Sequence, residues 1–286
     1  MSSNVKAALW MIGAIASFTS MAVAGRELAP AFDTFEIMFY RSCVGLLVVL
    51  IVATRHTGLS AIRIRKFGLH IVRNAAHFAG QNLWFFAVAS IPLAQVFALE
   101  FTSPIWAIFL APLVLGERIR AIQLLAAAIG FVGILFVAQP GAATLSFGLV
   151  AAALAAVGFG ATAVLTRRLT RTENTISILF FLTSVQLIFG LAAAGYDGDI
   201  ALPDPTGAPW LLLVGLAGLL AHFCLTSALR LAPAGFIMPI DFARLPLIVI
   251  IGTLWYQETI NSYVLLGGLI ILFANWLNLT RGNPAS

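Results

Sequence analysis

The segment "ALEFTSPIW" (98–106) places a glutamate, Glu100, inside one of the most apolar runs of the chain. No basic residue lies near Glu100 in the sequence, and Pro104 follows it four residues later. A carboxylate in apolar surroundings needs a partner or a water-filled cavity, because burying an unpaired charge is costly. The segment therefore predicts a buried ionic site, and the rest of the chain indicates what surrounds it.

The composition is that of a membrane protein. Hydrophobic residues make up 61% of the 286 residues and charged residues 9%, whereas a soluble domain carries about 25% charged residues. The net charge of +5 does not indicate nucleic acid as a partner, because the basic residues lie in short loops between apolar segments. Two cysteines, Cys43 and Cys224, lie in apolar stretches with no metal-ligand spacing, so they predict neither a metal site nor a disulfide framework.

Ten segments approach the roughly 20 mostly apolar residues that a membrane-spanning helix needs. They are residues 6–24, 36–54, 68–89, 93–114, 121–138, 147–165, 175–195, 209–229, 234–254 and 262–279. These runs are apolar on all sides, which is not the alternation of a membrane barrel. The first segment also resembles a secretory signal, because Ala22-Val23-Ala24 follows Lys6 and an apolar run. We favour an uncleaved helix there, since the second half of the chain contains its counterpart.

The basic residues of the loops lie almost entirely on one side of the predicted membrane. If the N-terminus is cytoplasmic, Arg26 is external, and so is the acidic loop "YDGDIALPDP" (196–205). The basic residues on the cytoplasmic side are then Lys6, Arg55, Arg63, Arg65, Lys66, Arg118, Arg120, Arg167, Arg168, Arg171, Arg230 and Arg281. Because cytoplasmic loops carry an excess of Lys and Arg, we expect both termini in the cytoplasm.

An internal repeat appears when the chain is shifted by 141 residues. The shift superimposes Pro92 on Pro233, Glu100 on Asp241, Phe101 on Phe242, Glu117 on Glu258, Gln81 on His222 and Phe18 on Phe159. We therefore predict two repeats, 1–140 and 141–286, of five helices each. Because five is odd, the second repeat enters the membrane inverted. Inverted repeats are typical of secondary transporters, whose substrate site lies near the midplane between the halves.

The pattern "SPIWAIFLAPLVLGERI" (103–119), with its weaker second copy "LPLIVIIGTLWYQETI" (245–260), resembles the EamA-type transporters of the drug/metabolite transporter superfamily. The resemblance covers essentially the whole chain. It implies ten helices, with a central pathway lined mainly by helices 1, 3, 4, 6, 8 and 9. Members of the family export amino acids, as the aromatic amino-acid exporters of the YddG type do, or carry riboflavin or S-adenosylmethionine.

Two acidic residues are the leading candidates for the substrate site. Glu100 lies eight residues into its helix from the outer end, and Asp241 eight residues into its helix from the inner end. At 1.5 Å per residue each is about 12 Å deep, where ionisable residues usually face a cavity or a partner. They are candidates for binding a substrate amine or for proton coupling. Alternatively, Asp241 and Arg244 neutralise each other as an i,i+3 pair.

Polar and aromatic side chains extend the candidate site. His70, Arg73, Asn74, His77 and Gln81 share one helical face, which we expect to face protein or water, with His70 and Arg73 near headgroups. His77, Gln81 and the repeat-related His222 are candidate pathway residues or satisfied core residues, and a histidine is a plausible proton carrier. The aromatic candidates for an apolar slot are Phe18, Phe159, Trp84 and Phe101, with Phe78 and Trp106 as further possibilities.

Two further features lie near these residues. Pro104, Pro112, Pro239 and Pro246 are expected to break or kink the helices beside the acids. Arg41, some five residues inside its helix, is expected to extend to the outer interface. The alternative for Arg41 is pairing with Glu36 or with a substrate carboxylate.

Several function classes lack their motifs. A phosphate-binding loop, metal-ligand spacing and a nucleophile–base constellation are all missing from the sequence, so we expect no ATP coupling, no cofactor, no metal and no enzymatic activity. A small multidrug-type cation antiporter is a weaker alternative, since those relatives depend on a glutamate in their first helix. The first helix here offers Ser17, Thr19 and Ser20 as its inner polar residues.

The sequence therefore predicts an all-α integral membrane protein that moves small molecules across the bacterial inner membrane by alternating access. Glu100 and Asp241 balanced against Arg41 and Arg244, with aromatic neighbours, favour a zwitterion with an apolar side chain. The first hypothesis is thus an amino-acid exporter, aromatic amino acids included. The alternative is an importer of a larger metabolite such as riboflavin or S-adenosylmethionine. Ten helices supply both halves of the pathway, so we expect a monomer in the lipid bilayer.

Overall fold

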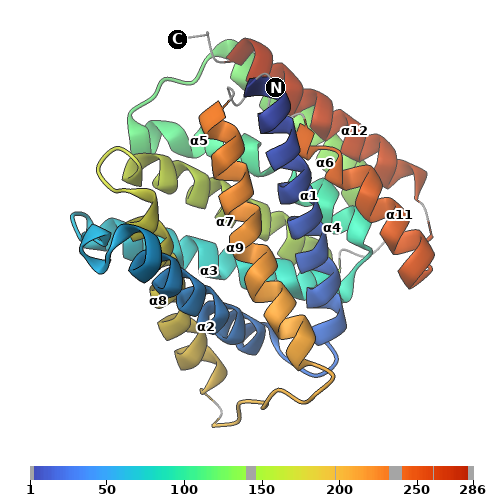
Figure 1. The fold of residues 1–286 in the computed structure, drawn as a ribbon. Helices are drawn as coiled ribbons and strands as arrows, with labels where there is room; N and C mark the ends of the chain where they lie inside the picture. Colours follow the sequence, from blue (N-terminus) through green and yellow to red (C-terminus); the bar gives the residue numbers. More distant parts are fainter. Residues whose placement is uncertain (1–2, 140–145, 197, 232–239, 260, 283–286) are drawn as a thin grey trace.

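The computed structural model describes residues 3–139, 146–196, 198–231, 240–259 and 261–282, and these residues form helices and loops without a strand. The helices of the first half are α1 (Ser3–Leu28), α2 (Thr34–Val52), α3 (Phe67–Ser90), α4 (Leu93–Glu100), α5 (Ser103–Leu115) and α6 (Ala121–Ala138). Those of the second half are α7 (Phe147–Leu169), α8 (Thr175–Ala194), α9 (Ala208–Leu231), α11 (Arg244–Tyr256) and α12 (Ser262–Leu277). Short turns η1 (Ala53–Thr57), η2 (Leu59–Ala61) and η3 (Asn278–Gly282) follow α2 and α12 (Figure 1).

Eight described helical segments are long and apolar enough to cross a membrane. They correspond to the predicted spans except 68–89 and 234–254. The first exception is α3, which has 24 residues but carries the polar stripe. The second is represented by α11, a shorter apolar helix of 13 residues. Pro233, Pro239 and the side chain of Arg230 lie outside the described residues. The count of ten spanning helices therefore stays a prediction, while the all-helical membrane fold is confirmed.

The surface is largely apolar, unlike that of a soluble protein, and the interior holds a set of polar residues beside its apolar core. Leu113, Leu254 and Trp255 are each at least three-quarters exposed. His70, Asn74 and the other members of the α3 stripe are buried. Such an outer surface suits lipid, which provides no hydrogen-bond partners, so the polar groups gather inside.

Both candidate acids lie where a helix is interrupted. The last residue of α4 is Glu100, and α5 begins at Ser103 after a short turn, because Pro104 has no N–H to continue the ladder. In the second half Asp241 precedes an equivalent turn, and α11 begins at Arg244, 141 residues after Ser103. The predicted breaks at Pro104 and in the Asp241 region are thus present at matching positions.

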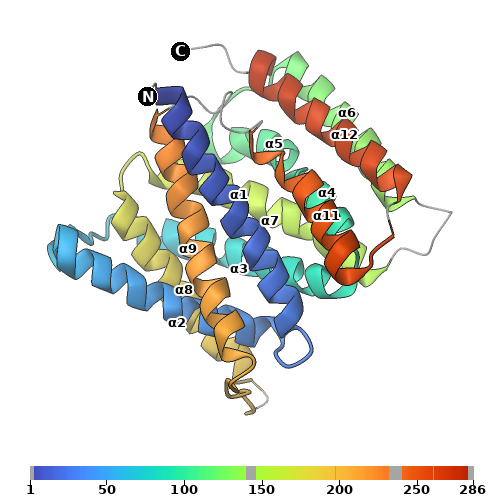
Figure 2. The ribbon, with the colours of Figure 1, turned by 45° about the vertical axis from the view of Figure 1, so that its right-hand side comes forward.

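The main helix pairs are related by the repeat. The longest interfaces join α1 to α9 and α3 to α7, which are each other's counterparts under the repeat. The helices α2 and α8, which are counterparts, face each other, as do the counterparts α6 and α12 (Figure 2). The helix α4 also contacts α11. Gly133 and Gly267 allow the α6–α12 contact, because a Cβ on Gly267 would lie 2.6 Å from the carbonyl oxygen of Gly133.

Two ion pairs, located at different ends of the helices, are also related to each other by the 141-residue shift. Arg26, at the end of α1, pairs with Glu258 and donates to the carbonyl oxygens of Val88 and Ile91. Glu258 in turn accepts from the backbone N–H of Leu93 at the start of α4. The second pair joins the counterparts of Arg26 and Glu258, with 2.9 Å between Arg167 Nη2 and Glu117 Oε1. The side chains of the first pair are 16% and 13% exposed and those of the second are 62% and 37% exposed.

Candidate functional site

The partner of Glu100 is Arg244, which the break before α11 directs toward α4. Arg244 Nη1 lies 3.0 Å from Glu100 Oε1, and Arg244 Nη2 lies 2.6 Å from Asp241 Oδ2. The indole N–H of Trp84 donates to Glu100 Oε2 at 2.8 Å. One guanidinium thus joins the two repeat-related acids, and the cluster carries one excess negative charge when all three groups are ionised. We call Glu100, Asp241, Arg244 and Trp84 the ionic cluster.

Aromatic rings cover the guanidinium of Arg244. Its Cζ lies 4.7 Å from the ring centroid of Phe18, 5.0 Å from that of Phe101 and 5.6 Å from that of Phe97. Such contacts are favourable because the face of an aromatic ring carries partial negative charge. Phe18 and Phe101 were predicted for this slot. Sequence reasoning missed Phe97, although its position three residues before Glu100 on α4 indicated the same neighbourhood.

A chain of rings leads from the ionic cluster into the bundle. The ring centroids of Phe18 and His222 lie 5.7 Å apart, those of His222 and His77 lie 6.1 Å apart, and those of His77 and Phe159 also lie 6.1 Å apart. The repeat partners Phe18 and Phe159 therefore flank two histidines that come from α3 and α9. Gln81 follows His77 by one helical turn and is also buried.

The α3 stripe faces the protein interior, as predicted. The further expectation that His70 and Arg73 meet lipid headgroups is wrong, because both residues are at most 5% exposed. Arg73 donates to Thr166 Oγ1 and Asn74 Oδ1, and His70 Nε2 lies 3.7 Å from Glu173 Oε1. The loop before α3 turns these residues inward, since Glu173 also accepts the backbone N–H groups of residues 65 and 66.

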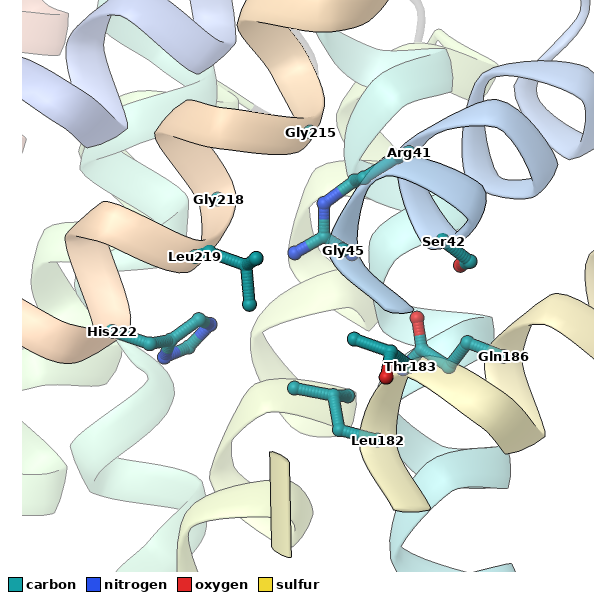
Figure 3. A pocket seen from close by; sticks show the side chains of 10 residues that line it. All are labelled: Arg41, Ser42, Gly45, Leu182, Thr183, Gln186, Gly215, Gly218, Leu219 and His222. Atoms are coloured by element: carbon teal, nitrogen blue, oxygen red, sulfur yellow. The ribbon is translucent and has the colours of Figure 1, made fainter. Parts of the chain in front are cut away.

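A pocket between α2, α8 and α9 contains Arg41 (Figure 3). The expectation that Arg41 reaches the outer interface is wrong, because it is 7% exposed. Its guanidinium extends toward α9, where the absence of a side chain at Gly218 leaves room: a Cβ there would lie 2.8 Å from Arg41 Nε. Pairing with Glu36 is also excluded in this structure, since Glu36 accepts the N–H groups of Asp33 and Ala201 instead. His222 lines the same pocket, which joins it to the ring chain.

Gln186, on α8, lines this pocket and was missed by sequence reasoning. It is 1% exposed, and neither atom of its amide has a hydrogen-bond partner among the described residues. The signal in the sequence was an amide side chain inside the apolar run 175–195. The ten predicted site residues and these two additions thus lie in one largely buried region that connects the two halves.

Several known proteins are similar to this chain in sequence, and one is similar in fold. The family model of the EamA-like transporter family matches twice, over residues 5–139 and 146–280. A riboflavin transporter from Rhizobium johnstonii is 32% identical, covering 96% of this chain and 91% of the relative. A riboflavin transporter from Brucella anthropi is 30% identical, with 93% and 95% coverage. An S-adenosylmethionine uptake transporter from Rickettsia bellii is 24% identical, with 92% and 89% coverage.

A protein of known crystal structure has the same fold at 16% sequence identity, with a TM-score of 0.67 over 96% of each chain. The names of these relatives indicate a membrane transporter rather than an enzyme, and they do not support amino-acid export. The double family match and the identity to full-length relatives agree with the resemblance carried by residues 103–119. The chain belongs to the EamA-like transporter family, within the drug/metabolite transporter superfamily.

Proposed function

We propose that this protein imports riboflavin, or a closely related planar vitamin, across the bacterial inner membrane. The observation that carries the proposal is the identity of 32% and 30% to two riboflavin transporters over nearly the whole chain. The buried region supports it chemically. It offers aromatic rings for a flat ring system, and hydrogen-bonding groups from His77, Gln81 and Gln186 for the carbonyl and N–H groups of such a ring.

The geometry weighs against the amino-acid exporter that charge balance favoured. That hypothesis required Glu100 or Asp241 to bind a substrate ammonium. Both carboxylates already bind Arg244, at 3.0 and 2.6 Å, so a substrate amine would have to displace an internal cation. The proposal therefore assigns these three residues to holding α4 against α11, and the rings around them to the substrate.

The transport mechanism that we propose is alternating access by two inverted five-helix repeats, 1–140 and 141–286, in a ten-helix monomer with cytoplasmic termini. The exchange-symmetric packing of α1 with α9 and of α3 with α7 supports this arrangement. So does the location of the start of α1 and the end of α12 at one end of the bundle (Figure 1). In this mechanism the Arg26–Glu258 pair closes one end of the pathway. Its exposed counterpart, Arg167–Glu117, lies at the end that would close in the alternate state.

The experiment that tests the proposal is uptake of labelled solutes into proteoliposomes. The panel contains riboflavin, S-adenosylmethionine and phenylalanine, each with and without a pH gradient. Saturable riboflavin uptake, inhibited by excess unlabelled riboflavin but not by phenylalanine, is the expected result. Growth of a riboflavin auxotroph at low external riboflavin is the matching test of direction. Phenylalanine flux without riboflavin flux would overturn the proposal.

S-adenosylmethionine uptake is a second candidate, favoured by the Rickettsia bellii relative. The excess negative charge of the ionic cluster and the rings of Phe18, Phe97 and Phe101 suit a sulfonium cation. Flux of S-adenosylmethionine that depends on Asp241, with no riboflavin flux, would replace the first candidate by the second.

A further inference from the structure

The pocket around Arg41 lies at the contact between the two repeats. Three of its lining residues come from α2 (Arg41, Ser42 and Gly45) and three from α8 (Leu182, Thr183 and Gln186). Each α2 residue is the repeat counterpart of one α8 residue, 141 positions later. The α2–α8 side of the pocket therefore lies at the contact between the two repeats, the interface where inverted-repeat transporters bind their substrates, and the other four lining residues come from α9.

The two halves supply different chemistry at these equivalent positions. Arg41 corresponds to Leu182, and Gln186 corresponds to Gly45. On the flanking helices His77 of α3 corresponds to Gly218 of α9. At each of these paired positions one half therefore carries a polar side chain and the other a small or apolar residue. The lining is therefore not symmetric, and its two polar side chains that are unpaired within the described part of the chain are Arg41 from the first half and Gln186 from the second.

Two polar side chains in this pocket, Arg41 and Gln186, have groups without a partner among the described residues. Arg41 forms no hydrogen bond or ion pair with any residue that the structure describes, and its Nε is fully buried. The oxygen and nitrogen of the Gln186 amide are likewise without partners among the described residues. The neighbouring hydroxyls do not fill this role, since Ser42 donates to Met38 O and Thr183 donates within its own helix. Leaving such groups unpaired is unfavourable, and most of all inside a membrane.

The available atoms specify the kind of ligand group. A guanidinium only donates hydrogen bonds, whereas a carboxamide donates from its nitrogen and accepts at its oxygen. An imide edge, in which an N–H lies between two carbonyls, offers acceptors to Arg41 and both an acceptor and a donor to Gln186. The pyrimidinedione ring of a flavin has such an edge. Its remaining rings would extend past His222, which lines the pocket and contacts Phe18.

We propose that Arg41 and Gln186 bind the imide edge of the substrate's pyrimidinedione ring, an assignment that rests on the proposed function. The pocket volume is about 10 Å³, enough for about one water molecule. Ring binding therefore requires α2 to move relative to α8 and α9. That movement is the relative motion of the two halves, because α2 belongs to the first and α8 and α9 to the second. Substrate binding and the transport movement are thereby coupled.

The test compares riboflavin with N3-methylriboflavin, whose imide cannot donate a hydrogen bond. Uptake of both by one proteoliposome preparation gives a ratio that is independent of the amount of folded carrier. In the wild-type protein we expect riboflavin to be preferred by about tenfold or more in kcat/KM, the effect of one unpaired buried group. Gln186→Leu should reduce this preference to near unity, whereas Gln123→Leu, on the distant helix α6, should keep it. Arg41→Gln should raise the KM for riboflavin.

The outcomes separate the two proposals. Riboflavin uptake with a preference that Gln186→Leu leaves unchanged would overturn the assignment of the imide edge while keeping riboflavin as substrate. Equal uptake of both flavins by the wild-type protein would do the same. Absence of riboflavin uptake by the wild-type protein would overturn the proposed function, and with it this assignment.

Discussion

Glu100 and Asp241 lie at equivalent positions of the two repeats, and both bind the same guanidinium, that of Arg244. The arrangement is asymmetric, because the counterpart of Arg244 in the first repeat is Ser103. One cation from the second half therefore joins the interrupted helices of both halves. Glu100, the charge inside the apolar run 98–106, therefore contributes to the contact between the two halves.

Removing the shared cation should destabilise the protein strongly. Arg244→Gln leaves two carboxylates close together in a site where all three side chains are at most 14% exposed. Breaking a buried ion pair by removing one partner costs about 3–5 kcal/mol. We expect a lower midpoint of thermal unfolding in detergent, and a partial recovery in the double variant Glu100→Gln/Arg244→Gln, which leaves fewer unpaired charges.

The control for this prediction is Arg168→Gln. Arg168 is exposed and donates to the carbonyl oxygen of Val114, so its replacement should change the midpoint little. Equal midpoints for the Arg244 and Arg168 variants would show that the ionic cluster does not hold the halves together.

The two matching ion pairs should respond differently to the same substitution. Arg26→Gln breaks a largely buried pair and should cost about 3 kcal/mol or more of unfolding free energy. Arg167→Gln breaks an exposed pair and should cost less than about 1 kcal/mol. The midpoints of chemical unfolding measure both. A similar loss in the two variants would contradict the difference in burial.

The Arg26–Glu258 pair also predicts a change in the accessibility of Leu93 to reagents. Leu93 is fully buried, and its N–H binds Glu258. After replacement of Cys43 and Cys224 by serine, a Leu93→Cys variant should react slowly with a membrane-impermeant thiol reagent. Adding Arg26→Gln should accelerate labelling, because the end of the bundle loses its closing contact. Adding Arg167→Gln should not accelerate it, and acceleration there would argue against a closure specific to Arg26.

The all-helical fold and the family could be predicted from the sequence because they depend on signals that are local or repeated. Apolar runs of spanning length and the match of Glu100 with Asp241 required no knowledge of side-chain contacts. The α3 stripe was predicted to face protein or water for the same reason, since five polar residues shared one helical face, although His70 and Arg73 were expected near headgroups.

The partners of buried charges were harder to predict because they come from distant parts of the chain. Arg244 meets Glu100 across 144 residues. The burial of Arg41 depends on space beside Gly218, and a glycine in an apolar helix does not reveal what fills its place. The names of the relatives do not support the amino-acid substrate that charge balance favoured, and formal charge balance did not show that Arg244 already binds both acids.

The close approach of α6 and α12 gives a prediction about packing. A Cβ on Gly267 would lie 2.6 Å from the carbonyl oxygen of Gly133, which is backbone and cannot rotate away. Overpacking of this kind typically costs about 1–3 kcal/mol. Gly267→Ala should therefore lower the unfolding midpoint. Gly68→Ala, where no atom lies within 4 Å of the added Cβ, is the control and should leave the midpoint nearly unchanged.

Gly218→Ala should affect transport more than stability. The added Cβ would lie 2.8 Å from Arg41 Nε and 2.9 Å from Arg41 Nη2, at the end of a flexible side chain that can move aside. The guanidinium would then leave its position in the pocket that Gln186 also lines. We expect a raised KM for the transported flavin, with a change in the unfolding midpoint smaller than that of Gly267→Ala. An unchanged KM would mean that the position of Arg41 does not matter for substrate binding, whereas a large loss of stability would indicate that this arginine is held rigidly by its surroundings.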